Sequence, residues 1–114
     1  MHELGIMSSA VDAALEEARA RGAARVHRMV LRIGALSGVD PDALRFAFDS
    51  ATADTPAAEA ELVVEEVPVR VHCDACAVDF ETEDRFVFSC PQCGKLSWEI
   101  RQGREIELVR IEIS

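Results

Sequence analysis

The chain begins Met1-His2-Glu3, and these residues form a candidate metal-chelating site. A histidine at position 2 brings a free α-amine, a backbone amide nitrogen and an imidazole nitrogen within reach of one ion, because they close consecutive chelate rings. Nitrogen donors in one plane suit Ni(II) or Cu(II), whereas Zn(II) prefers a tetrahedron. So short a motif also arises by chance, and the residues alone leave open that His2 is a solvated residue at a helix start.

Four cysteines form a second candidate metal site. Cys73 and Cys76 make one pair and Cys90 and Cys93 another, with two residues between the members of each. Each pair can occupy one edge of a tetrahedral ion, so the spacing predicts a four-cysteine zinc site. The segment between the pairs is slightly shorter than the roughly 15 to 20 residues typical of such sites, but it suffices for a hairpin. A zinc with four protein ligands has no open position, which indicates a structural role.

Other interpretations of the cysteines remain open. They could form disulfides, although a chain without a signal peptide is expected in the cytoplasm, where thiols stay reduced. The knuckle Cys90-Pro91-Gln92-Cys93-Gly94 also resembles the one that holds iron in rubredoxin, which would make the protein a one-electron carrier. The colour of the purified protein distinguishes these alternatives, because an iron-thiolate protein is red and a zinc protein is colourless. A zinc-ribbon interaction module that binds nucleic acid is a further alternative.

Composition and charge exclude several classes of function. The 114 residues, 49% of them hydrophobic, suffice for one compact domain with a small appendage. The net charge of −9 opposes binding to nucleic acid, which needs clustered lysines and arginines. No apolar run is long enough to cross a membrane. No nucleophile–base pair or open catalytic metal site can be recognised, so we expect a protein that is not an enzyme.

The apolar periodicity predicts two helices and three strands. Steps of three and four predict a helix over residues 3–21, with Leu4 and Leu15 on its apolar face. Asp40-Pro41 predicts the N-cap and first residue of a second helix. A proline that cannot donate to a ladder predicts an edge, a bulge or the exit from the sheet at position 68. Alternating apolar residues predict strands at 25–34, 61–71 and 104–113.

Taken together, these motifs resemble the HypA/HybF family of nickel metallochaperones for hydrogenase maturation. The resemblance covers essentially the whole chain, and it is specific because order, spacing and length agree at once. Two positions depart from the family pattern without removing a ligand: Gly5, where serine is common, and Ala77, where glycine often follows the first cysteine pair. The motifs that carry the resemblance are Met1-His2-Glu3-Leu4, Val39–Leu44, Phe46-Ala47-Phe48, the two cysteine pairs and Gly103–Leu108.

The resemblance implies an α+β fold, in which two helices pack on a small mixed three-stranded sheet and a zinc-ribbon-like domain with four cysteine ligands is inserted. We expect a nickel-binding α/β domain of residues 1–69 plus 104–114, and an inserted zinc-binding domain of residues 70–103. The implied function is to bind Ni(II) transiently and deliver it for maturation of [NiFe]-hydrogenase. The implied partners are a hydrogenase-maturation GTPase and the hydrogenase large subunit, and in some organisms urease maturation proteins.

The resemblance also raises His2 from a chance residue to a nickel ligand, together with Met1 and Glu3. Asp40 is fully explained as an N-cap, and a second role as a nickel ligand or as an acceptor for the His2 imidazole is a further candidate.

Six other side chains are interpreted as having no part in the metal sites. His27 is expected in a strand. His72 is expected to be a solvated residue at a strand end, and the alternative is that its charge senses zinc occupancy beside Cys73. Phe86 and Trp98 are expected to cover the zinc hairpin, along with Phe80 and Phe88, and the alternative for Trp98 is an anchor for a partner protein.

Overall fold

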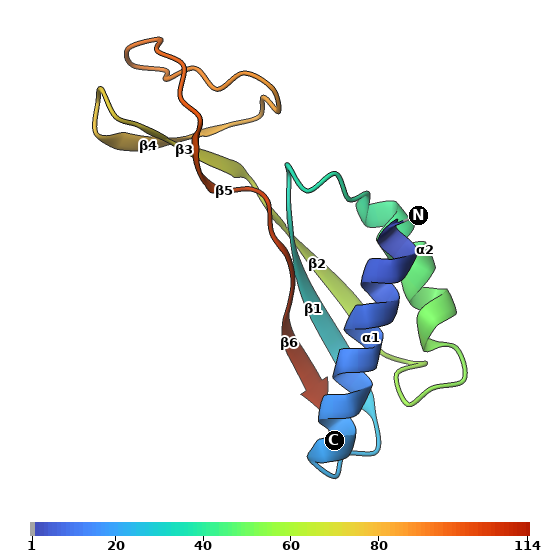
Figure 1. The fold of residues 1–114 in the computed structure, drawn as a ribbon. Helices are drawn as coiled ribbons and strands as arrows, with labels where there is room; N and C mark the ends of the chain where they lie inside the picture. Colours follow the sequence, from blue (N-terminus) through green and yellow to red (C-terminus); the bar gives the residue numbers. More distant parts are fainter. Residues whose placement is uncertain (1) are drawn as a thin grey trace. The chain divides into compact units, whose positions relative to one another are not determined.

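The computed structural model describes residues 2–114, so the predicted ligand Met1 lies outside the described residues. Two helices and two three-stranded sheets make up the described chain (Figure 1). The elements are α1 (His2–Ala20), β1 (Val26–Gly34), α2 (Pro41–Thr52), β2 (Glu61–Val67), β3 (Val69–Cys73), β4 (Val78–Thr82), β5 (Glu99–Gln102) and β6 (Ile106–Ile113).

Helix α1 confirms the predicted helix within a residue at each end. Gly22, with a φ of 71°, follows it in the left-handed conformation that commonly ends a helix. The prediction of its buried face was partly wrong, because Leu4 is 43% exposed and Leu15 is half-buried. Small side chains let α1 lie close against its neighbours, and it packs beside α2 (Figure 1). The buried residues of α1 are Met7, Ala10, Val11, Ala14 and Ala18.

Helix α2 begins as predicted. The Asp40 carboxylate accepts a hydrogen bond from the backbone N–H of Asp42 at 3.0 Å, which satisfies one of the free N–H groups of the first turn. Pro41 follows as the first helical residue, where its missing N–H costs nothing. Leu44 and Phe48 are buried on the inner face of the helix.

The first sheet has the strand order β2-β1-β6, and it confirms the predicted mixed sheet of three strands. At one end of the β1–β6 pair, Arg25 and Ser114 exchange backbone hydrogen bonds, and at the other the N–H of Gly34 donates to Glu105, so these strands run antiparallel. The β1–β2 pair is flanked by bonds from Val26 to Pro56 and from Ala35 to Val67, an order that identifies parallel strands.

The prediction of one continuous strand over residues 61–71 was wrong. Pro68 separates β2 from β3, and the two strands belong to different sheets. Of the alternatives for this proline, exit from the sheet is the one observed. Proline cannot donate a ladder hydrogen bond, so it suits a point where the chain leaves one sheet for another. The carbonyl of Pro68 instead accepts a hydrogen bond from the Gln102 side chain at 3.1 Å.

The second sheet has the order β4-β3-β5, and both pairings are antiparallel. In the β3–β4 ladder, Val71 lies opposite Phe80 and Cys73 opposite Val78. One buried cluster covers this sheet, with half-buried Leu36 packed against its edge. The cluster consists of Val69, Val71, Cys73, Phe80, Phe88 and Cys90.

The chain divides into two compact units. The helical unit contains residues up to 31, residues 39–65 and residues 107–114. The cysteine unit contains residues 32–38 and 66–106. The short segment 32–38 therefore belongs with the cysteines, although it is far from them in the sequence.

Two glycines allow a close backbone approach within the cysteine unit. A Cβ atom added at Gly34 would lie 2.1 Å from the carbonyl oxygen of Gly103, far inside van der Waals contact. Gly103 itself has a φ of 127°, which only glycine adopts readily. The backbone N–H of Leu36 donates to the same Gly103 carbonyl at 2.6 Å. The segment 32–38 is thus held against Gly103 by a contact that leaves no room for a side chain.

We predict that Gly34→Ala destabilises the protein by about 3 kcal/mol, because the new methyl group must push two backbones apart. Urea unfolding of the zinc-loaded protein measures the effect. Gly5→Ala is the matched control: a Cβ at Gly5 meets nothing within 4 Å, and alanine in a helix gains roughly 0.5–1 kcal/mol over glycine. Equal stability of the two variants would contradict the close approach.

Candidate metal centres

The four cysteines converge in the cysteine unit, as their spacing predicts. Cys73 is the last residue of β3, and Cys76 lies in the turn that leads to β4. Cys90 and Cys93 bound a second turn, which Gly94 closes with a φ of 76°. The first turn closes at Ala77 with a φ of 55°, so a non-glycine residue occupies a left-handed position there. That conformation costs an alanine roughly 1–2 kcal/mol, so the turn is held by its surroundings.

The separations of the sulfur atoms fit a tetrahedral metal site. Cys73 Sγ lies 3.7 Å from Cys93 Sγ, and Cys90 Sγ lies 3.9 Å from Cys76 Sγ. All four sulfurs lie within 4.8 Å of one another. A tetrahedral zinc with Zn–S bonds of ~2.3 Å places its sulfurs ~3.8 Å apart. The sulfurs are too far apart for disulfides, which require ~2.05 Å.

The surroundings of the sulfurs shift the pKa values of two of the thiols in opposite directions. Backbone N–H groups of Cys93 and Gln92 donate to the Cys90 sulfur and lower the pKa of that thiol to about 7. The hydrogen bond with Cys93, followed by burial, raises the pKa of Cys76 to about 12. Without a cation, the group therefore shares protons among crowded sulfurs rather than ionising fully. A divalent ion that takes four thiolates matches this donor set.

The predicted nickel ligands lie in the helical unit, at the start of α1. His2 Nε2 is 3.3 Å from Glu3 Oε2, and the His2 side chain is 61% exposed. The same Glu3 oxygen accepts the backbone N–H of Asp40 at 3.2 Å. The structure thus brings His2, Glu3 and Asp40 together, although the last two lie 37 positions apart in the sequence.

Sequence reasoning missed the Glu3–Asp40 hydrogen bond. Nothing in the sequence indicates it, because a backbone N–H donor can occur at any residue except proline. Hydrogen bonds from the backbone N–H of Glu3 itself and then from Asp40 lower the pKa of the Glu3 carboxyl. The Asp40 carboxylate meanwhile faces the N–H of Asp42. Glu3 therefore links the start of α1 to the start of α2.

His72 was predicted to be a solvated strand-end residue, and this prediction was wrong. Its Nδ1 lies 2.7 Å from Asp79 Oδ1 in the neighbouring strand, and its side chain is 20% exposed. The hydrogen bond from His72 lowers the pKa of Asp79. Its Nε2 faces Asp74 at 3.5 Å, and Glu99 lies close to both.

The aromatic cover of the cysteines differs from the prediction. Phe80 and Phe88 are buried as predicted, but Phe86 is 83% exposed and Trp98 is 66% exposed. Trp98 packs edge-to-face on Phe88, with ring centroids 6.0 Å apart. The sequence could not distinguish Phe86 from Phe88, because both lie in the irregular loop after β4.

None of the helices in residues 2–114 is long and apolar enough to cross a membrane.

Comparison with known proteins gives one consistent family. The family described as "Hydrogenase/urease nickel incorporation, metallochaperone, hypA" matches residues 1–113. A protein named hydrogenase maturation factor HypA from Chloroflexus aggregans is 46% identical over 112 residues, which cover 98% of each chain. Its namesake from a Picosynechococcus strain is 41% identical over 99% of each chain.

Solved structures agree with the fold. The solution structure titled "Solution structure of HypA protein" matches all of this chain and 97% of its own length, with a TM-score of 0.68 and 25% identity. The nickel metallochaperone HypA from Helicobacter pylori matches 97% of this chain and 96% of its own, with a TM-score of 0.64 and 24% identity.

Proposed function

Because this chain belongs to the HypA family of hydrogenase/urease nickel-incorporation metallochaperones, we propose that it binds Ni(II) at its N-terminus and delivers it for maturation of [NiFe]-hydrogenase. The match of the family to residues 1–113 carries this proposal. We propose Met1, His2 and Glu3 as the nickel ligands, with Asp40 as a further candidate. The nickel is cargo, and the protein does not act on it catalytically.

The geometry around His2 supports a site that can release its ion. The imidazole is mostly exposed, and the first N–H groups of any α-helix lack partners within the helix ladder, so amide nitrogens at this end are not committed to it. A nickel held by few ligands at the surface can pass to an acceptor by stepwise ligand exchange. Copper would bind such a site more tightly than nickel, so selectivity must come from metal supply and partner docking.

We propose that Cys73, Cys76, Cys90 and Cys93 hold a structural Zn(II). Their sulfur separations suit a tetrahedral ion, and two of the four cysteines are almost fully buried. When bound, zinc supplies the positive charge that lets four crowded thiols ionise together. In this proposal the helical unit carries the nickel and the cysteine unit carries the zinc. The corresponding expected domains are 1–69 plus 104–114 and 70–103, and they differ from the units in where residues 32–38 belong. The same tetrahedral geometry would suit iron, so a rubredoxin-like electron carrier remains the second candidate.

The proposed partners follow from the family. Delivery of nickel requires contact with the hydrogenase large subunit, and we propose a maturation GTPase as the companion of this step. Relatives are named as hydrogenase maturation factors, and the family description includes urease, so urease maturation proteins are further candidates.

Nickel titration of the untagged, zinc-loaded protein tests the proposal. We expect one equivalent of Ni(II) to produce a weak yellow d–d band, because planar coordination by nitrogen differs from octahedral coordination. Calorimetry in buffers of different ionisation enthalpy should reveal released protons, since an amine, an imidazole and an amide must lose theirs. Acid should therefore unload nickel before zinc.

Two results would contradict these assignments. Nickel binding without proton release would be incompatible with the proposed nitrogen ligands. A red protein that contains iron instead of zinc would favour the electron carrier.

A further inference from the structure

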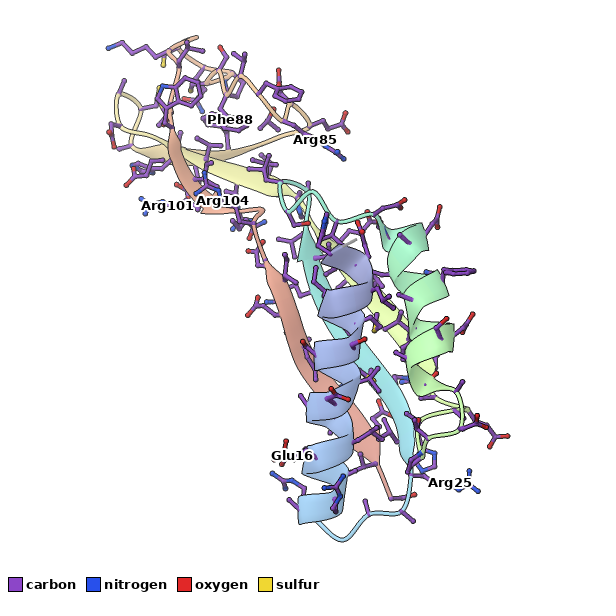
Figure 2. The ribbon with its side chains drawn as sticks, turned by 45° about the vertical axis from the view of Figure 1, so that its right-hand side comes forward. Glu16, Arg25, Arg85, Phe88, Arg101 and Arg104 are labelled. Carbon is purple, nitrogen blue, oxygen red and sulfur yellow. The ribbon has the colours of Figure 1, made fainter. Side chains whose placement is uncertain are left out.

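The cysteine unit carries an apolar pocket that the metal sites do not use. Its floor includes buried Phe88 and half-buried Ile100 of β5. Leu36 comes from the segment after β1, and Phe86 from the loop after β4. Figure 2 labels Phe88 together with the arginines of this region. The full lining is Leu36, Arg85, Phe86, Phe88, Trp98, Ile100 and Arg104.

Two aromatic side chains at this pocket are left largely in water. Phe86 is 83% exposed and Trp98 is 66% exposed, whereas Phe88 beneath them is only 4% exposed. Exposed single apolar residues are ordinary, but two aromatic rings at one pocket form the kind of anchor that partner proteins bury. Trp98 is also held in place, because its ring packs edge-to-face on Phe88. This contact positions the Trp98 ring at the pocket.

Two arginines of the pocket lack an ion-pair partner. Most of the other arginines lie beside carboxylates; Arg101, for example, has its guanidinium 3.6 Å from Asp79 and 3.9 Å from Glu99. Among residues 2–114, Arg85 and Arg104 have no such ion pair. Acids outnumber bases in the chain by 21 to 12, and the guanidinium groups of Arg85 and Arg104 nevertheless line one apolar pocket without an ion pair among the described residues. Figure 2 shows Arg85 and Arg104 in this part of the chain.

We propose that this pocket docks an acidic segment of a partner protein, with an aromatic or aliphatic side chain of the segment against Phe86 and Trp98 and flanking carboxylates on Arg85 and Arg104. Guanidinium groups suit carboxylates because their paired N–H donors match both oxygens. Aromatic residues and arginine are also the residues most enriched where interfaces bind tightly. The positive charge of the two arginines thus complements a carboxylate-rich peptide.

The net charge of the chain separates this occupant from other anions. A charge of −9 repels every anion over long range, but it acts most strongly on the extended charge of an anionic lipid surface or of nucleic acid, which two arginines cannot offset. A short segment that places one apolar side chain between carboxylates needs only the local chemistry of the pocket. The proposal does not rest on nickel binding at His2.

Trp98 makes the test direct, because it is the only tryptophan in the chain and lies in the pocket. The probe is an acetylated, amidated decapeptide with phenylalanine and leucine set between aspartates and glutamates. We expect it to shift Trp98 emission saturably and more weakly as salt rises. A peptide with asparagine and glutamine in place of the acids should bind about tenfold more weakly, and a lysine version not detectably.

A charge-reversed variant and a matched control locate the binding. Arg85→Glu with Arg104→Glu should weaken the acidic peptide about tenfold or more. Arg19→Glu with Arg110→Glu changes the net charge equally but alters exposed arginines of the helical unit, so it should bind the peptide normally. Zinc content checks that the cysteine unit of each variant is folded, and circular dichroism checks the helices.

Three outcomes would overturn the proposal. The first is equal binding of the acidic and neutral peptides, or of the two variants. The second is a concentration-dependent dimer that Phe86→Ser abolishes, which would identify the occupant as a second copy of the chain. The third is a shift of Trp98 emission by phosphatidylserine vesicles but not by the acidic peptide, which would identify a lipid surface.

Discussion

Replacing Cys73 by serine is expected to abolish stoichiometric zinc binding and to unfold the cysteine unit, while α1 and α2 stay folded. Cys73 is 2% exposed and belongs to the same buried cluster as Val71 and Phe88, so it is both a ligand and a core residue. Structural zinc contributes ~10–16 kcal/mol in small zinc-binding peptides, and a unit of this size cannot replace that from its own core. Metal analysis gives the zinc content, and amide NMR spectra report each unit separately.

Ser89→Ala is the matched control for this prediction. Ser89 adjoins Cys90 and donates its hydroxyl to the Gly94 carbonyl at 3.1 Å, yet it is exposed and has no sulfur. This variant should keep one zinc per chain. Loss of the α1 and α2 signals in Cys73→Ser would show that the units do not fold independently. Retention of one tightly bound zinc would refute a site closed by four thiolates.

The second prediction concerns the nickel ligands. His2→Ala removes the imidazole, and a single glycine added before Met1 moves the α-amine one residue further from His2. Each change should weaken nickel binding about 100-fold or more, since losing only a ligand's hydrogen-bond partner commonly costs roughly 10- to 100-fold. Hydrogenase maturation in cells should fail with both proteins. Zinc content and helicity should stay unchanged, because neither change touches the cysteine unit.

His27→Ala serves as the control for the imidazole. His27 is an exposed histidine in β1 whose Nε2 contacts the Ser114 hydroxyl, and it takes no part in the proposed site. Nickel binding should survive its loss. If the glycine-extended protein binds and delivers nickel normally, the α-amine is not a nickel ligand. The side chains of His2 and Asp40 would then be the proposed nickel ligands.

The parts of this fold that the sequence predicts are those set by local spacing. The Asp40-Pro41 cap specifies a helix start through its own hydrogen bond, and two residues between paired cysteines fix a turn. These signals act over a few residues, so they need no knowledge of the rest of the chain. The convergence of the cysteines was predicted correctly for that reason, whereas the α+β fold was predicted from the resemblance of the whole chain to a family.

Features that depend on distant contacts were not predictable. Pro68 indicated an interruption, but only the pairing of β3 with β4 and β5 shows that a second sheet begins there. Leu4 is 43% exposed and Phe86 is 83% exposed, and composition cannot reveal which apolar residues lack a covering neighbour. The Glu3–Asp40 bond likewise joins residues that share no motif.

The membership of residues 32–38 in the cysteine unit has a consequence for how this protein can be recombined. An excised peptide of residues 66–106 would keep all four cysteines but lose Leu36 and the backbone that rests on Gly103. A graft of that peptide into another scaffold would therefore expose apolar surface that Leu36 normally covers. The cysteine unit is made of two separate stretches of the chain, 32–38 and 66–106, with part of the helical unit between them. Gene fusion or exon shuffling can therefore move the unit intact only if both stretches are transferred.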